Sequence, residues 1–246
     1  MKTIRKFNYN EIKQIYSKYV QKTPEYFKKY DNTLERINEL KQDFENDKRN
    51  IVEKDIIERS DAPRIFTLLD FKEWVVKHKI NPINKLLITS NDRELIYLDP
   101  KYVKHISYNQ DPYNNDLHNL FLEERDFDFV IFCQTLEHLY NPWLGLSNIS
   151  NHIKKGGYVF TSAPTLNIPH LMPAHYYGFT PMGLATMCLS VGLEPVETGQ
   201  FGNKDYINYI YEKQDWPTYH KLIDKNGCIK NEEGCDSMVW ILAKKL

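Results

Sequence analysis

The feature that most constrains this sequence is a block near its middle, residues 116–164, in which strand-like and helix-like patterns alternate. An almost unbroken apolar run, Phe127 to Cys133, is typical of a strand buried on both faces of a sheet. Asn141-Pro142 then opens a stretch with apolar residues at helical spacing, which residues 154–157 (Lys-Lys-Gly-Gly) are expected to end. A second apolar run follows at Tyr158 to Ser162. This order predicts a right-handed βαβ unit of a parallel sheet.

Polar residues follow both predicted strands. Gln134, Thr135, Glu137 and His138 come directly after the first strand, and residues 162–165 end the second. Ligands of open α/β sheets bind at the carboxyl ends of the parallel strands. The sequence therefore places both groups on the rim of a site.

The block also resembles class I S-adenosylmethionine-dependent methyltransferases of the small-molecule type. These domains show, in order, Asp-x-x-x-Leu, Phe-Asp-x-Val, Leu-Glu-His, Lys-Gly-Gly and Ser-x-Pro, which begin here at residues 116, 127, 136, 155 and 162. The resemblance spans about residues 85–200. It implies a doubly wound, mostly parallel seven-stranded α/β sheet and S-adenosylmethionine as cofactor. We expect a helical N-terminal appendage at residues 1–80 and the methyltransferase domain at residues 81–246.

The turn after the first strand of the sheet, predicted at Lys85 to Thr89, departs from the family pattern. The family usually has a glycine-rich turn there, whereas this chain has Ser90, Asn91 and Asp92 and no glycine between Lys85 and Asp126. Asn and Asp tolerate unusual backbone angles, so this polar turn remains a candidate to approach the cofactor.

The other cofactor residues are assigned from the resemblance. Asp111, just beyond a second strand predicted at His105 to Tyr108, is the nearest carboxylate for the ribose hydroxyls, with Asn109 and Gln110 as competitors. Asp116 and Leu117 match the position beside the adenine, although Asp116 is equally suited to cap a turn or helix. Gln134, Thr135 and Glu137 complete the expected set.

Histidines and tyrosines are the candidates for the acceptor side. His138 is a candidate general base, because an imidazole titrates near neutral pH, or alternatively shapes its loop through a backbone hydrogen bond. His175 is the second candidate base. His170, Tyr176 and Tyr177 lie in a proline-stiffened loop suited to line a substrate site. His170 and His175 lack an evident third ligand, so no metal is predicted.

Composition excludes several classes. The net charge of -1 gives no electrostatic reason for nucleic acid binding, and no apolar run reaches membrane-spanning length. The four cysteines lack paired metal-ligand spacing, and the chain is expected to be a reduced, cytoplasmic protein. The N-terminal helices are either an appendage packed on the sheet or a lid or arm that forms a homodimer.

Two functions are compatible with these patterns. The first is a methyltransferase that acts on a small molecule or sugar acceptor by in-line transfer. The second is a non-catalytic, methyltransferase-like binding module that has lost its cofactor site, as the missing glycines would allow. Fold resemblance alone does not separate them.

Overall fold

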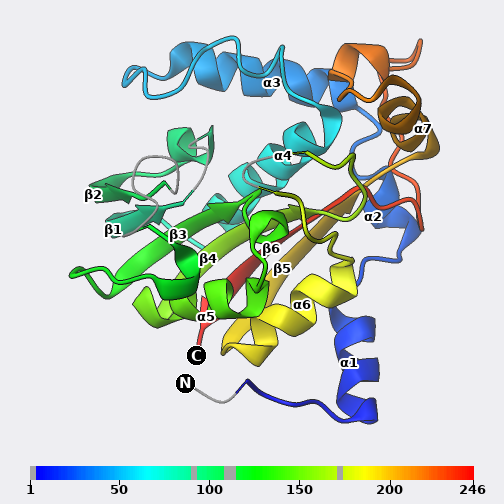
Figure 1. Cartoon of the computed structure of the whole chain (residues 1–246). Coiled ribbons are helices and arrows are strands. Elements are labelled where there is room, and N and C mark those ends of the chain that lie inside the picture. Colours follow the sequence, from blue (N-terminus) through cyan, green and yellow to red (C-terminus); the bar gives the residue numbers. More distant parts are fainter. Residues whose placement is uncertain (1–3, 90–92, 108–114, 171–173) are drawn as a thin grey trace.

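The computed structural model describes residues 4–89, 93–107, 115–170 and 174–246. These residues form one six-stranded sheet in the order β2-β1-β3-β4-β6-β5. The strands are β1 (Ile83–Ile88), β2 (Pro100–His105), β3 (Phe127–Cys133), β4 (Ile153–Pro164), β5 (Leu193–Phe201) and β6 (Met238–Lys245). The strands β1 to β4 are parallel, and β6 lies antiparallel between β4 and β5 (Figure 1).

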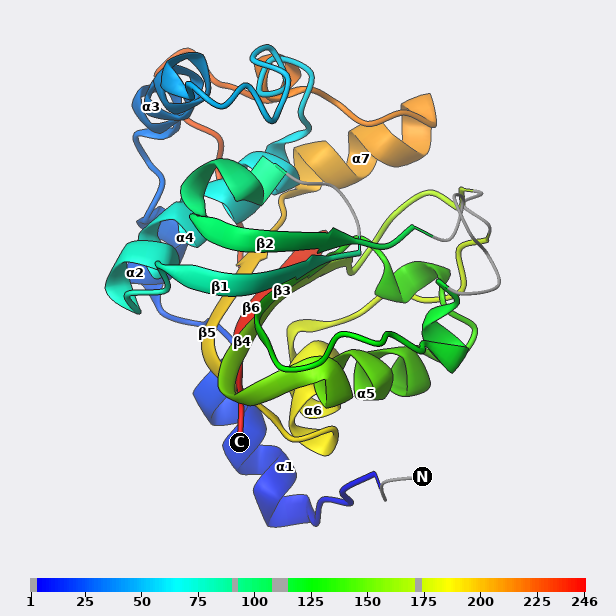
Figure 2. The ribbon, with the colours of Figure 1, turned by 90° about the vertical axis from the view of Figure 1, so that its left-hand side faces the viewer.

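Helices cover both faces of the sheet. Figure 2 shows α3 (Thr33–Asn46) and α4 (Ala62–Lys77) on one side, and α1 (Tyr9–Tyr19), α5 (Pro142–His152) and α6 (Pro181–Ser190) on the other. The remaining elements are α2 (Pro24–Lys28), α7 (Lys204–Lys213), and the 3-10 turns η1 (Arg93–Tyr97), η2 (Leu117–Asn119), η3 (Leu136–His138) and η4 (Tyr219–Lys221). Among the described residues, no helix combines the length and apolar character needed to cross a membrane.

The central strand β3 contributes to both halves of the core. Phe129 and Ile131 pack in the cluster that contains Phe71 of α4, whereas Val130 and Phe132 face the cluster that contains Leu146 of α5. All four strand side chains are fully buried. Each such burial is worth about 1.5–3 kcal/mol, which is why this apolar run can form only a central strand.

The predicted fold class is confirmed, with one strand fewer than expected. The described residues contain six strands where the resemblance implies seven, and β2 has no described partner on its outer edge.

Three predicted boundaries were wrong. The second strand lies at Pro100–His105 rather than His105 to Tyr108, because this edge strand is mostly exposed and carries no apolar pattern. Strand β4 begins directly at Ile153, so Gly156, at φ +79°, lies in an irregular start of the strand rather than at the exit of the helix. The apolar spacing of residues 66–79 predicts a helix that starts at Phe66, whereas helix α4 starts four residues earlier, at Ala62, after Asp61 and with proline in its first turn.

A buried carboxylate joins the N-terminal helices to the sheet. Asp70 of α4 lies 2.7 Å from Lys29 Nζ and accepts a 2.9 Å hydrogen bond from Trp240 Nε1 of β6. Gly199 of β5 leaves the space for this contact, because a Cβ there would lie 2.1 Å from Trp240 Nε1. The domain boundary at residue 80 stays a prediction, although α4 contributes directly to the core of the sheet.

Candidate functional site

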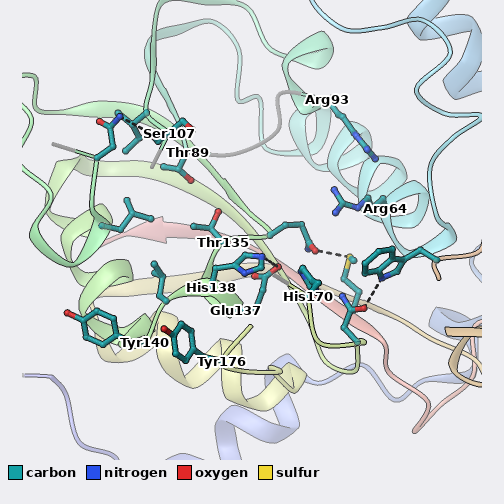
Figure 3. Close-up of a pocket in the computed structure, with 18 of the residues that line it drawn as sticks. Arg64, Thr89, Arg93, Ser107, Thr135, Glu137, His138, Tyr140, His170 and Tyr176 are labelled. Carbon is teal, nitrogen blue, oxygen red and sulfur yellow. Dashed lines mark hydrogen bonds and ion pairs between the residues drawn. The ribbon is translucent and has the colours of Figure 1, made fainter. Parts of the chain in front are cut away.

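A cavity of about 780 Å³ opens at the carboxyl ends of β1 and β3 (Figure 3). Sequence-predicted residues that line it are Asp116, Leu117, Gln134, Thr135, Glu137, His138, His170 and Tyr176. His175 and Tyr177 are not among the residues that line it. Ser90, Asn91, Asp92 and Asp111 lie outside the described residues. The structure therefore brings together most of the described candidates, from residues 116–117, 134–138, 170 and 176.

The end of β3 is shaped by Gln134. Its backbone has φ +50°, its N–H donates to the carbonyl of Ser162 at 2.8 Å, and its side-chain amide donates to Ser162 Oγ at 3.1 Å. Thr135 Oγ1 in turn donates to the carbonyl of Cys133. These bonds hold the ends of β3 and β4 together and turn the chain sharply at the rim of the cavity.

Asp116 lines the cavity and caps the turn η2. One carboxylate oxygen, Oδ1, accepts from the backbone N–H of His118 at 2.9 Å and lies 2.8 Å from His118 Nδ1. His118 Nε2 accepts from the backbone N–H of Asn141 at 3.3 Å, which fixes the proton on Nδ1. The ring also stacks on Tyr140 at 3.8 Å. The cap role considered from sequence is present, and among the described residues Oδ2 has no hydrogen-bond partner.

Glu137 is a buried carboxyl group, and no lysine or arginine among the described residues lies within ion-pair distance of it. Its side chain is 1% exposed, and Oε2 has no hydrogen-bond partner among the described residues. Burial raises the pKa of Glu137 to about 8, opposed by a backbone hydrogen bond and the charge of Arg64. The group is therefore predominantly protonated and uncharged at neutral pH.

His138 is neutral and has one ring nitrogen free to accept a proton. Its Nδ1 lies 2.8 Å from the carbonyl of Ala174, so Nδ1 carries the proton and Nε2 the lone pair. Burial, and to a smaller degree His170 and His175, lowers the pKa of His138, while the bond to Ala174 acts in the other direction. Nε2 is 3.9 Å from the nearer oxygen of Glu137, beyond hydrogen-bond distance.

His175 is placed less favourably for proton transfer than His138. Its Nδ1 lies 3.4 Å from the carbonyl of Ile168, and its Nε2 lies 3.1 Å from the carbonyl of Tyr177. Both ring nitrogens thus face backbone acceptors. Tyr177 donates through its hydroxyl to the carbonyl of Tyr140 at 3.1 Å, which ties the 174–177 segment to the start of α5. The roles expected for His175 and Tyr177 at the acceptor side stay predictions.

His138, His170 and His175 form a cluster, with ring centroids 4.8–6.2 Å apart. In the part of the chain that the structure describes, no group of three or more His, Cys, Asp or Glu side chains is arranged to hold a metal ion. His170 Nδ1 is instead 3.0 Å from the carbonyl of Ile168, and its ring meets Trp216 edge to face at 5.6 Å. Of the three, His138 and His170 line the cavity.

Several lining residues were not found from the sequence. Arg64 and Arg93 come from α4 and η1, and Asn115 donates through its side-chain amide to the carbonyl of Ser107 at 2.8 Å. One signal was available for Arg64. It lies in the first turn of the helix that precedes β1, and a helix antiparallel to a strand begins over the carboxyl end of that strand.

Comparisons with known proteins support the methyltransferase resemblance over part of the chain. Residues 94–161 match a family described as "Methyltransferase domain". No curated protein has a matching sequence. Similar solved structures include 1,6-didemethyltoxoflavin-N1-methyltransferase of Burkholderia thailandensis with bound S-adenosylhomocysteine. This protein is 13% identical to the chain, with 92% of this chain and 93% of that chain covered and TM-score 0.47.

Two further structures are similar to a comparable degree. The N-methyltransferase NodS of Bradyrhizobium japonicum, in complex with S-adenosylhomocysteine, is 12% identical, with 85% of this chain and 98% of that chain covered and TM-score 0.45. A SAM-dependent methyltransferase of Archaeoglobus fulgidus is 16% identical, with 72% of this chain and 94% of that chain covered and TM-score 0.41. The region that matches the methyltransferase family, residues 94–161, contains the Phe-Asp-x-Val, Leu-Glu-His and Lys-Gly-Gly motifs. The family match thus confirms the resemblance indicated by these motifs over residues 94–161.

Proposed function

We propose that the protein transfers a methyl group from S-adenosylmethionine to a small-molecule or sugar acceptor in the cavity at the carboxyl ends of β1 and β3. One observation carries the proposal. Asp116 and the neutral imidazole of His138 line the same cavity, within a chain that matches the methyltransferase family in this region. When bound, the cofactor supplies a methyl group on a positively charged sulfur.

The residues at the Asp116 end fit the cofactor's adenosyl part. Oδ2 of Asp116, which has no hydrogen-bond partner among the described residues, is a hydrogen-bond acceptor for an exocyclic amine, and Leu117 beside it offers an apolar surface. Ser107 and Thr89 contribute polar groups nearby, as Figure 3 shows. The cavity volume of about 780 Å³ lies within the range of small-molecule and cofactor sites. The described residues therefore fit the group that the family uses.

The acceptor side is suited to positioning and proton removal. His138 Nε2 accepts a proton from an acceptor hydroxyl or amine, and the resulting imidazolium keeps its hydrogen bond to Ala174. The rings of His170, Tyr176 and Trp216 line the wall against which a planar or sugar ring packs. Methyl transfer depends mainly on alignment of the reacting atoms, so a wall that restricts the acceptor contributes directly to the rate.

Calorimetric titration with S-adenosylhomocysteine tests the proposal. Wild type is expected to bind, and Asp116→Ala to bind more weakly by about 1–3 kcal/mol, because a buried hydrogen bond is lost. Asp224→Ala is a matched control, since Asp224 also caps a turn through backbone N–H groups but does not line the cavity. Binding by Asp116→Ala equal to wild type would contradict the placement of the adenosyl part.

A non-catalytic binding module is the second candidate, favoured by the absence of glycine between Lys85 and Asp126. It predicts no heat and no thermal shift with S-adenosylmethionine or S-adenosylhomocysteine at millimolar concentration. Saturable binding of either compound argues against it. The homodimer through the N-terminal helices and the cytoplasmic location stay predictions.

A further inference from the structure

Two arginines lie together on the wall of the cavity that faces α4. Arg64 belongs to the first turn of α4, and Arg93 begins η1 just beyond β1. Both line the main cavity and also a smaller one beside Gln134 and Met238. Figure 3 shows their guanidinium groups reaching into the cavity from the same side, away from Ser107.

The hydrogen-bond donors of this pair are largely unused. Arg64 Nε lies 3.4 Å from Asp61 Oδ1, and Arg93 Nη1 donates to Ser60 Oγ at 2.9 Å. Arg93 Nε is buried without a hydrogen-bond partner, and no carboxylate lies within ion-pair distance of Arg93, as far as the described residues go. By contrast, Arg36 pairs with Glu73 and Arg59 with Asp55.

Two guanidinium groups and a helix end bring positive charge to this wall. Burial, followed by the positive charge of Arg64, lowers the pKa of Arg93, while the negative charges of Glu94 and Asp61 act in the other direction. The amino-terminal end of the 16-residue helix α4 adds positive partial charge at the same place. Glu137, another buried carboxyl group on the cavity wall, is predominantly neutral at pH 7.

We propose that Arg64 and Arg93 form a binding site for a carboxylate or phosphate group of a ligand in this cavity. The planar guanidinium forks match the paired oxygens of either group. The inference rests on the proposed function for its ligand, which leaves two sources for the anion: an acidic group of the acceptor, or the amino-acid carboxylate of the cofactor. An acidic group on the acceptor would restrict the substrates to anionic small molecules or acidic sugars.

Binding measurements on four proteins test the site and distinguish the sources. Wild type, Arg64→Gln, Arg93→Gln and the control Arg5→Gln, which changes an exposed arginine of the N-terminal segment, are titrated at low ionic strength. The ligands are S-adenosylhomocysteine, 5′-methylthioadenosine, which lacks the amino-acid part, and inorganic phosphate in the absence and presence of S-adenosylhomocysteine. Urea unfolding of each variant verifies that it is folded. If Arg93→Gln does not fold, the comparison of Arg64→Gln with wild type tests the site.

Each outcome decides the question. If the cofactor is the source, both variants lose about tenfold or more in affinity for S-adenosylhomocysteine and none for 5′-methylthioadenosine. If the acceptor is the source, both cofactor analogues bind the variants as they bind wild type. In the presence of S-adenosylhomocysteine, phosphate then binds wild type and the control, and its affinity for the two variants is about tenfold or more lower.

Two outcomes refute the anion site. In the first, all ligands bind the two variants as they bind wild type. In the second, phosphate binds none of the four proteins, and S-adenosylhomocysteine and 5′-methylthioadenosine each bind all four proteins with the same affinity. A failure of the proposed function is separable from these results. In that case neither adenosyl compound binds wild type, while phosphate binding that depends on Arg64 and Arg93 still supports the anion site.

Discussion

Replacing Glu137 with glutamine tests whether a buried, uncharged carboxyl group supports the rim of the site. Burial raises the pKa of Glu137 to about 8 in the folded protein, against 4.5 as its ordinary value. Between these two pH values the folded chain holds a proton that the unfolded chain has released. The free energy of unfolding therefore falls as pH rises from about 4.5 to about 8 and levels off above.

The size of this effect follows from proton linkage. One additional proton bound by the folded state changes the free energy of unfolding by about 1.4 kcal/mol per pH unit, which is an upper limit for this single group. Glutamine has nearly the same shape and does not titrate. The free energy of unfolding of the Glu137→Gln protein should therefore lack this slope, and it should increase relative to that of wild type as pH rises from 5 to 8.

Urea unfolding of wild type and Glu137→Gln from pH 5 to pH 8.5 measures the difference. Glu212→Gln, an exposed position on α7, is the matched control and should follow wild type. Burial also raises the pKa of Asp70 to about 6, while the charge of Lys29 acts in the other direction. Because Asp70 is present in all three proteins, its contribution to the pH dependence of stability cancels in the comparison. A stability difference that is constant over this pH range would refute the assignment of an uncharged Glu137.

Three further predictions concern the base and the sheet. Because Nδ1 of His138 faces the carbonyl of Ala174 and its pKa is lowered, ¹⁵N NMR at pH 7 should show a neutral ring protonated at Nδ1; an imidazolium spectrum would contradict this. His138→Ala should leave affinity for S-adenosylhomocysteine nearly intact but lower single-turnover methyl transfer on the order of 10²-fold, whereas equal rates would exclude His138 as the base. Gly199→Ala should destabilise the protein by about 1–3 kcal/mol in urea unfolding, since a Cβ would overlap Trp240; unchanged stability would show that Trp240 moves freely.

Strongly apolar elements were predictable from the sequence because local pattern and burial agree there. Phe127–Cys133 is buried almost throughout, and its predicted bounds are those of β3. The start of α5 at Pro142 was predicted correctly for a similar reason, since Asn141 caps the helix through the backbone N–H of Leu144. The edge strand β2 was misplaced because exposed strands need no apolar alternation.

The candidate site was predictable where its residues follow β3 and less so elsewhere. Gln134, Thr135 and His138 follow from the rule that ligands bind at carboxyl ends of parallel strands. Arg64 and Arg93 did not stand out, because their proximity depends on how α4 and η1 pack. His118 was missed although it lies two residues after Asp116, since its hydrogen bond to Asp116 and its stacking on Tyr140 become visible only in three dimensions.

The central claim is that this cavity holds the cofactor without a glycine-rich turn after β1. A crystal structure of the protein grown with S-adenosylhomocysteine tests it most directly. We predict electron density in the cavity, with the adenine beside Asp116 and Leu117 and the sulfur near Gln134 and His138. Crystals that show the compound bound elsewhere, or an empty cavity at a saturating concentration, would contradict the account.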